Sequence, residues 1–235
     1  MITVFGSINM DLVATTPRLP KPGETVAGTG FATAAGGKGA NQALAARRAG
    51  ADVRMAGAVG CDEFAGPALD LLDKAGTDLL GVARVDGPTG TALILVGGDG
   101  ENMIAVVPAA NGTVSAAQAE SAVEGMQDGD ILMLQQEVPA GSVKAALESA
   151  KDRGVRTVLN IAPLIPETEA LAALADIVIA NETEFERLVG RDNVTGEERE
   201  QILLDMHGKT GQILIVTLGA EGVIAAEGGT LHRTK

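Results

Sequence analysis

The sequence predicts an α/β protein with a doubly wound, mostly parallel sheet and a small β-sheet lid. First, short apolar runs alternate with helical segments along most of the chain, which is the pattern of repeated βα units. Second, the 46% hydrophobic content includes four Phe but no Trp or Tyr, so the strands consist of the aliphatic residues typical of buried parallel sheets. Third, a proline-rich segment and a glycine-rich hairpin interrupt the alternation. We assign residues 12–35 and 88–108 to the lid, inserted in one domain that spans residues 1–235.

Composition and charge exclude several classes of function. A net charge of −13 argues against a nucleic-acid partner, because phosphate backbones are bound by basic patches. No apolar segment approaches the length that spans a bilayer, so no membrane partner is expected. The single Cys61 cannot form an intramolecular disulfide, which fits a reducing compartment, and the N-terminal residues lack the pattern of a signal peptide. We therefore expect a cytoplasmic protein.

The first apolar run, residues 2–5, is predicted to be a buried strand that stops at Gly6. Asn9 and Asp11 follow this strand and are two residues apart. In an extended segment they would share one face and address one ligand, although Asn and Asp also commonly satisfy the backbone of a turn. Prolines and a glycine break up the next segment, and a further strand is predicted over residues 24–31.

Residues 36–42, Gly-Gly-Lys-Gly-Ala-Asn-Gln, precede an alanine-rich helical run over residues 43–49. Glycines allow the close approach of a ligand, and the first N–H groups of a helix lack intrahelical partners. Lys38 and Asn41 add side-chain donors, so the segment suits a polyhydroxylated or anionic small molecule. It is not a P-loop, because Gly39 follows the lysine where Ser or Thr is needed. Taken alone, the segment is equally consistent with close packing of a helix.

The rest of the chain continues the alternation. Further strands are predicted over residues 53–56, 130–134, 157–160, 177–180 and 213–217, and helices over residues 62–75, 115–126, 140–153, 181–189 and 198–207. Hairpins are predicted from residues 91–96 to 103–107 and around residues 228–229. Ligands of doubly wound sheets bind beyond the carboxyl ends of the strands. The polar residues that follow apolar strands are Asn9, Asp11, Gln135, Glu137, Asn160, Asn181, Glu184 and Thr217.

Six short motifs, each of which occurs once, follow one another in a characteristic order along the chain. They occupy residues 6–11 (Gly-Ser-Ile-Asn-Met-Asp), 22–25 (Pro-Gly-Glu-Thr), 36–42, 98–102 (Gly-Asp-Gly-Glu-Asn), 181–184 (Asn-Glu-Thr-Glu) and 217–222 (Thr-Leu-Gly-Ala-Glu-Gly). In order and spacing the set resembles the PfkB family of sugar kinases over essentially the whole chain. The resemblance implies transfer of the γ-phosphate of ATP to a sugar hydroxyl, and it implies a homodimer that pairs through the lids.

The resemblance also implies roles for individual residues. Three residues, Asn181, Thr217 and Gly219, would line the ATP site, and Glu184 would act on Mg²⁺ through water, because Mg²⁺ keeps much of its hydration shell. A monovalent cation, K⁺, would activate the enzyme. Without the other motifs, residues 181–184 read simply as the acidic start of a helix. The residues that would hold the sugar hydroxyls are Asn9, Asp11, Gly37, Lys38, Asn41 and Glu137.

The sequence departs from the family pattern in one respect. The Gly-Ala-Gly-Asp motif that carries the family's aspartate base is absent from residues 1–235, so we assign no catalytic residue and expect the base beyond Lys235. The chain is then either a piece of a longer active kinase or a non-catalytic protein that binds a sugar or a nucleotide. Asp11 and Glu137 suit sugar ligands better than substitute bases.

Among substrates, D-ribose, which would give ribose 5-phosphate, is favoured. A nucleoside kinase would stack the base on an aromatic side chain, and aromatic residues are scarce. A phosphosugar kinase would need more basic residues at the sugar site, where Lys38 is the clear candidate. Fructose and a keto-deoxy sugar acid stay open as alternatives.

Overall fold

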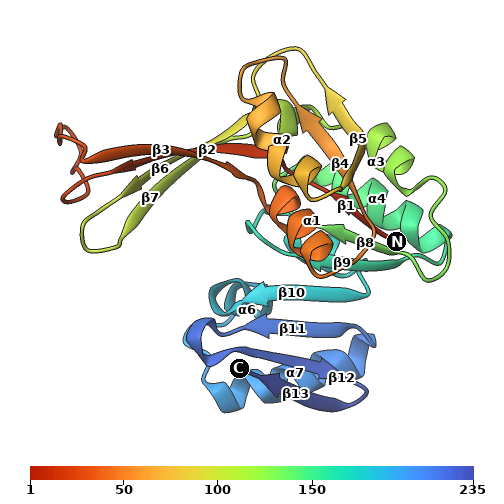
Figure 1. Ribbon diagram of the computed structural model, residues 1–235. Coiled ribbons are helices and arrows are strands. Elements are labelled where there is room, and N and C mark those ends of the chain that lie inside the picture. Colours follow the sequence, from red (N-terminus) through yellow and green to blue (C-terminus); the bar gives the residue numbers. More distant parts are fainter.

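The computed structural model describes all residues, 1–235 (Figure 1). One large sheet, called sheet A, contains nine strands: β1 (Ile2–Phe5), β4 (Val53–Val59), β5 (Asp78–Arg84), β8 (Ile131–Leu134), β9 (Arg156–Asn160), β10 (Ile177–Asn181), β11 (Ile213–Thr217), β12 (Val223–Glu227) and β13 (Thr230–Thr234). The spatial order is β13-β12-β11-β10-β9-β8-β1-β4-β5. Every neighbouring pair is parallel except β11–β12 and β12–β13. The predicted mostly parallel α/β sheet is therefore confirmed.

Helices cover both faces of sheet A. They are α1 (Lys38–Arg48), α2 (Ala65–Lys74), α3 (Ala116–Val123), α4 (Ala140–Asp152), α5 (Thr168–Ala172), α6 (Glu182–Val189) and α7 (Gly196–Thr210). Alternate residues of a strand face opposite sides, so Val4 packs with α1 and α2 while Phe5 packs with the larger cluster that includes α3 and α4. The aliphatic composition thus builds two cores, one on each face. None of the helices is long and apolar enough to span a bilayer.

A second sheet, called sheet B, extends away from sheet A like an arm (Figure 1). Its strands are β2 (Asn9–Thr15), β3 (Gly30–Gly36), β6 (Gly90–Val96) and β7 (Asn102–Val107), in the order β3-β2-β6-β7. Sheet B begins at Asn9, three residues before the expected start of the lid at residue 12. The chain crosses between the sheets four times, and the short segment after β1 is the first crossing.

The strand predicted over residues 24–31 is wrong for residues 24–29, and only Gly30 and Phe31 belong to a strand. Residues 24–29 have no strand structure, because Glu24 closes a turn: its N–H donates to the carbonyl of Lys21 (3.0 Å) and its carboxylate accepts from the Lys21 N–H (3.0 Å). Strand β3 instead pairs with β2 over Gly30–Gly36, where partners are available from Thr15↔Gly30 to Asn9↔Gly36. The sequence reasoning also missed β5, an edge strand without a periodic apolar pattern.

Two helix boundaries also differ. Helix α1 begins at Lys38 rather than at residue 43: Gly36 ends β3, Gly37 is the N-cap, and residues 38–42 already belong to the helix. Helix α7 extends from Gly196 to Thr210, because a capping box at Thr195 and Glu198 starts it, and Gly211 (φ 74°) ends it. The predicted stop at Gly208 is wrong, since glycine inside a helix costs only about 1 kcal/mol. The capping box at Ser115 and Gln118 is confirmed.

Candidate functional site

A cavity of about 730 Å³ lies between sheet B and the carboxyl ends of the sheet A strands. Its apolar wall includes Ala92, Ile94, Ile104 and Val106 of β6 and β7. Its polar lining includes all six of the residues predicted to hold a sugar: Asn9, Asp11, Gly37, Lys38, Asn41 and Glu137. These residues come from three elements, β2, α1 and the segment after β8, so the fold brings together side chains as much as 128 positions apart (137 − 9). Whether each of them contacts a sugar stays a prediction.

The N-terminus of α1 is held against the crossing from β1 to β2. Gly37 has φ 92°, and a Cβ placed there would lie 2.8 Å from the Asn9 nitrogen and the Ser7 oxygen. The N–H groups that begin the helix already have partners: that of Lys38 donates to Glu137 Oε2 (3.0 Å), and those of Gly39 and Ala40 donate to Ser7. The expectation that these N–H groups face a ligand is therefore wrong, because protein acceptors already occupy them.

Glu137 is the anion at this helix N-terminus. Its Oε2 accepts from the Ser7 hydroxyl (2.6 Å) as well as from the Lys38 N–H, and its Oε1 lies 4.0 Å from Lys38 Nζ. A carboxylate is stabilised at this end of a helix by the macrodipole. Ser7 is fully buried, and the sequence reasoning assigned it no role although it stands within the first family motif. The signal that could have found it was its position directly before the Asn9–Asp11 pair.

Asp11 lies half-buried in β2, on the same face as Asn9. Burial, and then the nearby negative charge of Glu137, raise the pKa of Asp11 above its ordinary value of 3.8. The cavity thus contains two carboxylates and one ammonium group, that of Lys38. Such a set can accept hydrogen bonds from several hydroxyl groups, and it disfavours a ligand that carries negative charge of its own.

The four residues predicted for the nucleotide and metal do not line this cavity. Asn181 and Thr217 are register partners at the carboxyl ends of β10 and β11, and Gly219 (φ 54°) follows β11, so they lie along the same edge of sheet A. Asn181 and Glu184 form a capping box: each backbone N–H donates to the other's side chain at 2.8 Å. This arrangement leaves Asn181 Nδ2 and Glu184 Oε1 without protein partners.

The groups at Asn181, Glu184 and Gly219 decide whether this edge of sheet A can hold ATP and Mg²⁺. A free amide donor and a positive-φ glycine beside parallel strand ends suit the polar parts of a nucleotide. No group of three or more acidic, histidine or cysteine side chains is placed to hold a metal ion. Glu184 alone therefore suits Mg²⁺ only when the ion keeps water molecules and phosphate oxygens as its other ligands.

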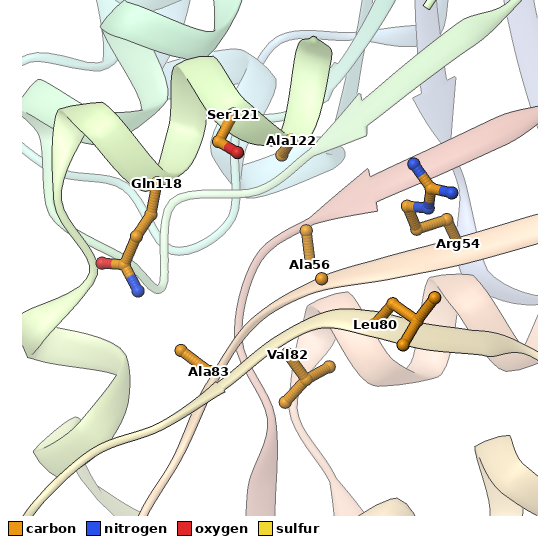
Figure 2. Close-up of a pocket in the computed structure, with 9 residues that line it drawn as sticks. Arg54, Ala56, Leu80, Val82, Ala83, Gln118, Ser121 and Ala122 are labelled. Carbon is orange, nitrogen blue, oxygen red and sulfur yellow. The ribbon is translucent and has the colours of Figure 1, made fainter. Parts of the chain in front are cut away.

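A second hollow, of about 340 Å³, lies at the sheet edge between β4, β5 and α3. Figure 2 shows its wall, with Arg54, Leu80 and Val82 on the strand side and Gln118 and Ser121 on the helix side. Arg54 is its one charged side chain, and its Nε is paired with Asp78 at 2.8 Å. This hollow offers no convergent set of donors and acceptors, whereas the cavity beside sheet B does, and we therefore take the cavity beside sheet B as the candidate site.

A mostly parallel α/β sheet with a polar cavity at its strand ends is typical of enzymes that act on small polar molecules. Residues 1–235 match the pfkB family of carbohydrate kinases. Ribokinases from Haemophilus influenzae and Lactococcus lactis are each 36% identical, over 97% and 99% of this chain and 75% and 74% of their own lengths. The structure of Arabidopsis thaliana ribokinase complexed with ribose and ATP superposes with a TM-score of 0.83 at 30% identity, covering 100% of this chain and 77% of that one. The chain therefore belongs to the pfkB family of carbohydrate kinases.

Proposed function

We propose that this sugar kinase phosphorylates D-ribose, transferring the γ-phosphate of ATP to the 5-hydroxyl to give ribose 5-phosphate. The observation that carries the proposal is the convergence of Asn9, Asp11, Lys38 and Glu137 on one cavity. The relatives that are ribokinases support it, as does the relative solved with ribose and ATP. The electrostatics of the cavity favour a neutral sugar over a keto-deoxy sugar acid or a phosphosugar, because Glu137 already occupies the positive end of α1.

In this proposal the carboxylates of Asp11 and Glu137 accept hydrogen bonds from sugar hydroxyls, while Lys38 and Asn41 donate to them. The apolar wall from β6 and β7 covers the sugar and excludes water, which competes with the sugar as acceptor of the phosphoryl group. Sheet B thus acts as the lid.

ATP would be held by Asn181, Thr217 and Gly219, and Glu184 would orient the hydrated Mg²⁺. Mg²⁺ held there would supply positive charge to the phosphate groups. We also propose K⁺ as the monovalent activator. Residues 1–235 contain no Gly-Ala-Gly-Asp segment, so no residue of this chain is assigned as the base. A cytoplasmic location and a homodimer formed through sheet B complete the proposal.

The test is titration calorimetry of the chain with ribose, followed by an assay for ADP with ATP and Mg²⁺. We expect ribose to bind, and Asp11→Asn to weaken binding at least about tenfold, because the replacement amide removes a charged acceptor. Asp128→Asn, an exposed substitution of the same kind, is the matched control and should leave the dissociation constant unchanged. Equal affinities for the two variants would remove Asp11 from the site.

A second candidate is a non-catalytic sugar-binding protein that would use the same convergent side chains of the cavity without transferring a phosphoryl group. Binding of ribose without production of ADP would support it. Titrations with fructose and with 2-deoxyribose test the choice of sugar. Binding of fructose that is tighter than binding of ribose would overturn the proposed substrate.

A further inference from the structure

Asn111 is a buried residue of the 3₁₀ turn η1 (Ala109–Thr113), which returns the chain from β7 of sheet B to α3. Its exposed fraction is 1%, and it does not line the cavity. No motif in the sequence predicts a role for Asn111. Its side chain nevertheless reaches the crossing from β1 to β2, 103 positions earlier, where Asn9 enters the cavity.

The orientation of the Asn111 amide is determined by backbone groups. Its Oδ1 accepts from the Ile8 N–H (2.9 Å), and its Nδ2 donates to the Ile8 carbonyl (3.0 Å). A backbone N–H can only donate and a backbone carbonyl can only accept, so the oxygen and nitrogen of Asn111 are assigned without ambiguity. The other hydrogen of Nδ2 is then directed at Asn9.

This assignment also determines the orientation of Asn9. Asn111 Nδ2 donates to Asn9 Oδ1 at 2.7 Å, so the oxygen of the Asn9 amide faces the protein. Asn9 Nδ2 has no hydrogen-bond partner within the chain, and it is not sealed off from solvent. Asn9 also lines the cavity. Asn9 therefore presents a donor to a ligand, not an acceptor.

Gly90, at the start of β6, makes room for this pair. A Cβ at that position would lie 2.2 Å from Asn111 Nδ2 and 2.4 Å from Asn9 Oδ1. Both distances are far below van der Waals contact, so any side chain there would push the two amides apart. Three segments that are distant in sequence thus meet at one hydrogen bond.

We propose that Asn111 is a positioning residue: it holds Asn9 so that Asn9 Nδ2 donates to a hydroxyl oxygen of the sugar. The inference rests on the proposed function and deepens it. A hydroxyl group that donates its hydrogen to the Asp11 carboxylate can accept from Asn9, which lies two residues away on the same face of β2. The cavity therefore recognises a hydroxyl group as donor and acceptor at once.

The test is Asn111→Asp, with ribose binding measured by titration calorimetry. The carboxylate keeps an acceptor for the Ile8 N–H but cannot donate, so Asn9 turns its amide to donate to the new carboxylate and presents Oδ1 to the sugar. We expect the dissociation constant for ribose to rise at least about tenfold, while that for ATP changes less than about twofold. Asn193→Asp, at an exposed loop position, is the matched control and should leave both unchanged.

A double-mutant cycle separates positioning from a general structural effect. In an Asn9→Ala background, Asn111→Asp should change the ribose dissociation constant less than about twofold, because no amide remains to be turned. An equal effect in both backgrounds would overturn the inference. If circular dichroism shows that Asn111→Asp does not fold, Gly90→Ala is measured in its place. Normal ribose affinity of Gly90→Ala would then overturn the inference. A wild-type chain that does not bind ribose overturns the proposed function itself, and this titration is performed first.

Discussion

At the scale of single residues, Asp11 shows how a side chain that is proposed to bind the sugar can act against stability. Burial and the charge of Glu137 raise the pKa of its carboxyl group, so the folded chain binds this proton more tightly than the unfolded chain does. The free energy of unfolding therefore falls as the pH rises from the unfolded value near 3.8 through the raised folded value. Above that range, the ionised Asp11 makes a constant unfavourable contribution.

We predict that Asp11→Asn raises the thermal unfolding midpoint of the ligand-free chain at pH 7, because it removes the repulsion and the desolvated charge. The gain should shrink as the pH is lowered through the raised pKa of Asp11, because the wild-type carboxyl group then becomes protonated. Differential scanning calorimetry at several pH values measures this, with Asp128→Asn as the exposed control. A lower midpoint at pH 7 would show that the carboxylate stabilises the fold.

At the scale of elements, the start of α1 combines a structural and a functional requirement. Gly37 must adopt φ 92°, and its Cα hydrogens pack against the backbone of Ser7 and Asn9. In this position the Lys38 N–H reaches Glu137, and the Lys38 side chain enters the cavity. The glycines are needed for contact between protein segments first, and only through that contact do they shape the site.

We predict that Gly37→Ala destabilises the chain by about 2 kcal/mol, because alanine is strained at positive φ and its methyl group meets backbone atoms. Ribose binding should weaken as well, since Lys38 and Asn9 are displaced. Gly66→Ala in α2 is the matched control: its Cβ meets nothing within 4 Å, and we expect a gain of about 0.5 kcal/mol. Chemical denaturation measures the free energy of unfolding of both variants. Equal stability of the two variants would contradict the strain expected at Gly37.

At the scale of the whole molecule, sheet B has apolar side chains exposed on both of its faces. Phe31, Leu93 and Met103 lie on one face, with 71%, 48% and 52% of their surfaces exposed, and Ile104 (55%) lies on the face of the cavity. Edge strands and exposed apolar surface of this kind are usually covered by a partner. The proposed homodimer would cover them.

We predict that the double variant Met103→Lys with Ile104→Lys dissociates the homodimer, raising its dissociation constant at least about tenfold, because burying an unpaired ammonium group is costly. Adjacent strand residues face opposite sides, so the two single variants identify the buried face. Asn102→Lys, an exposed substitution in the same strand, is the control. Light scattering coupled to size-exclusion chromatography reports the mass; a monomeric wild-type chain would contradict the prediction.

Local patterns in the sequence were sufficient to predict the class of fold and most of the elements. Alternating apolar runs and capping residues depend on neighbours within one turn or strand, so strands such as β8 and caps such as Ser115 are readable from the chain. Six of the residues that line the cavity were also named in advance, but through a family resemblance rather than through residue chemistry alone.

Tertiary structure decided what depends on partners far apart in sequence. The position of β3 follows from its pairing with β2, and the occupied N-terminus of α1 follows from contacts with Ser7 and Glu137. Asn111 orients Asn9 across 102 positions, and no local pattern records this contact. Short-range periodicity predicts which segments form helices and strands. The direction in which a buried amide donates is set only when distant backbone groups have packed around it.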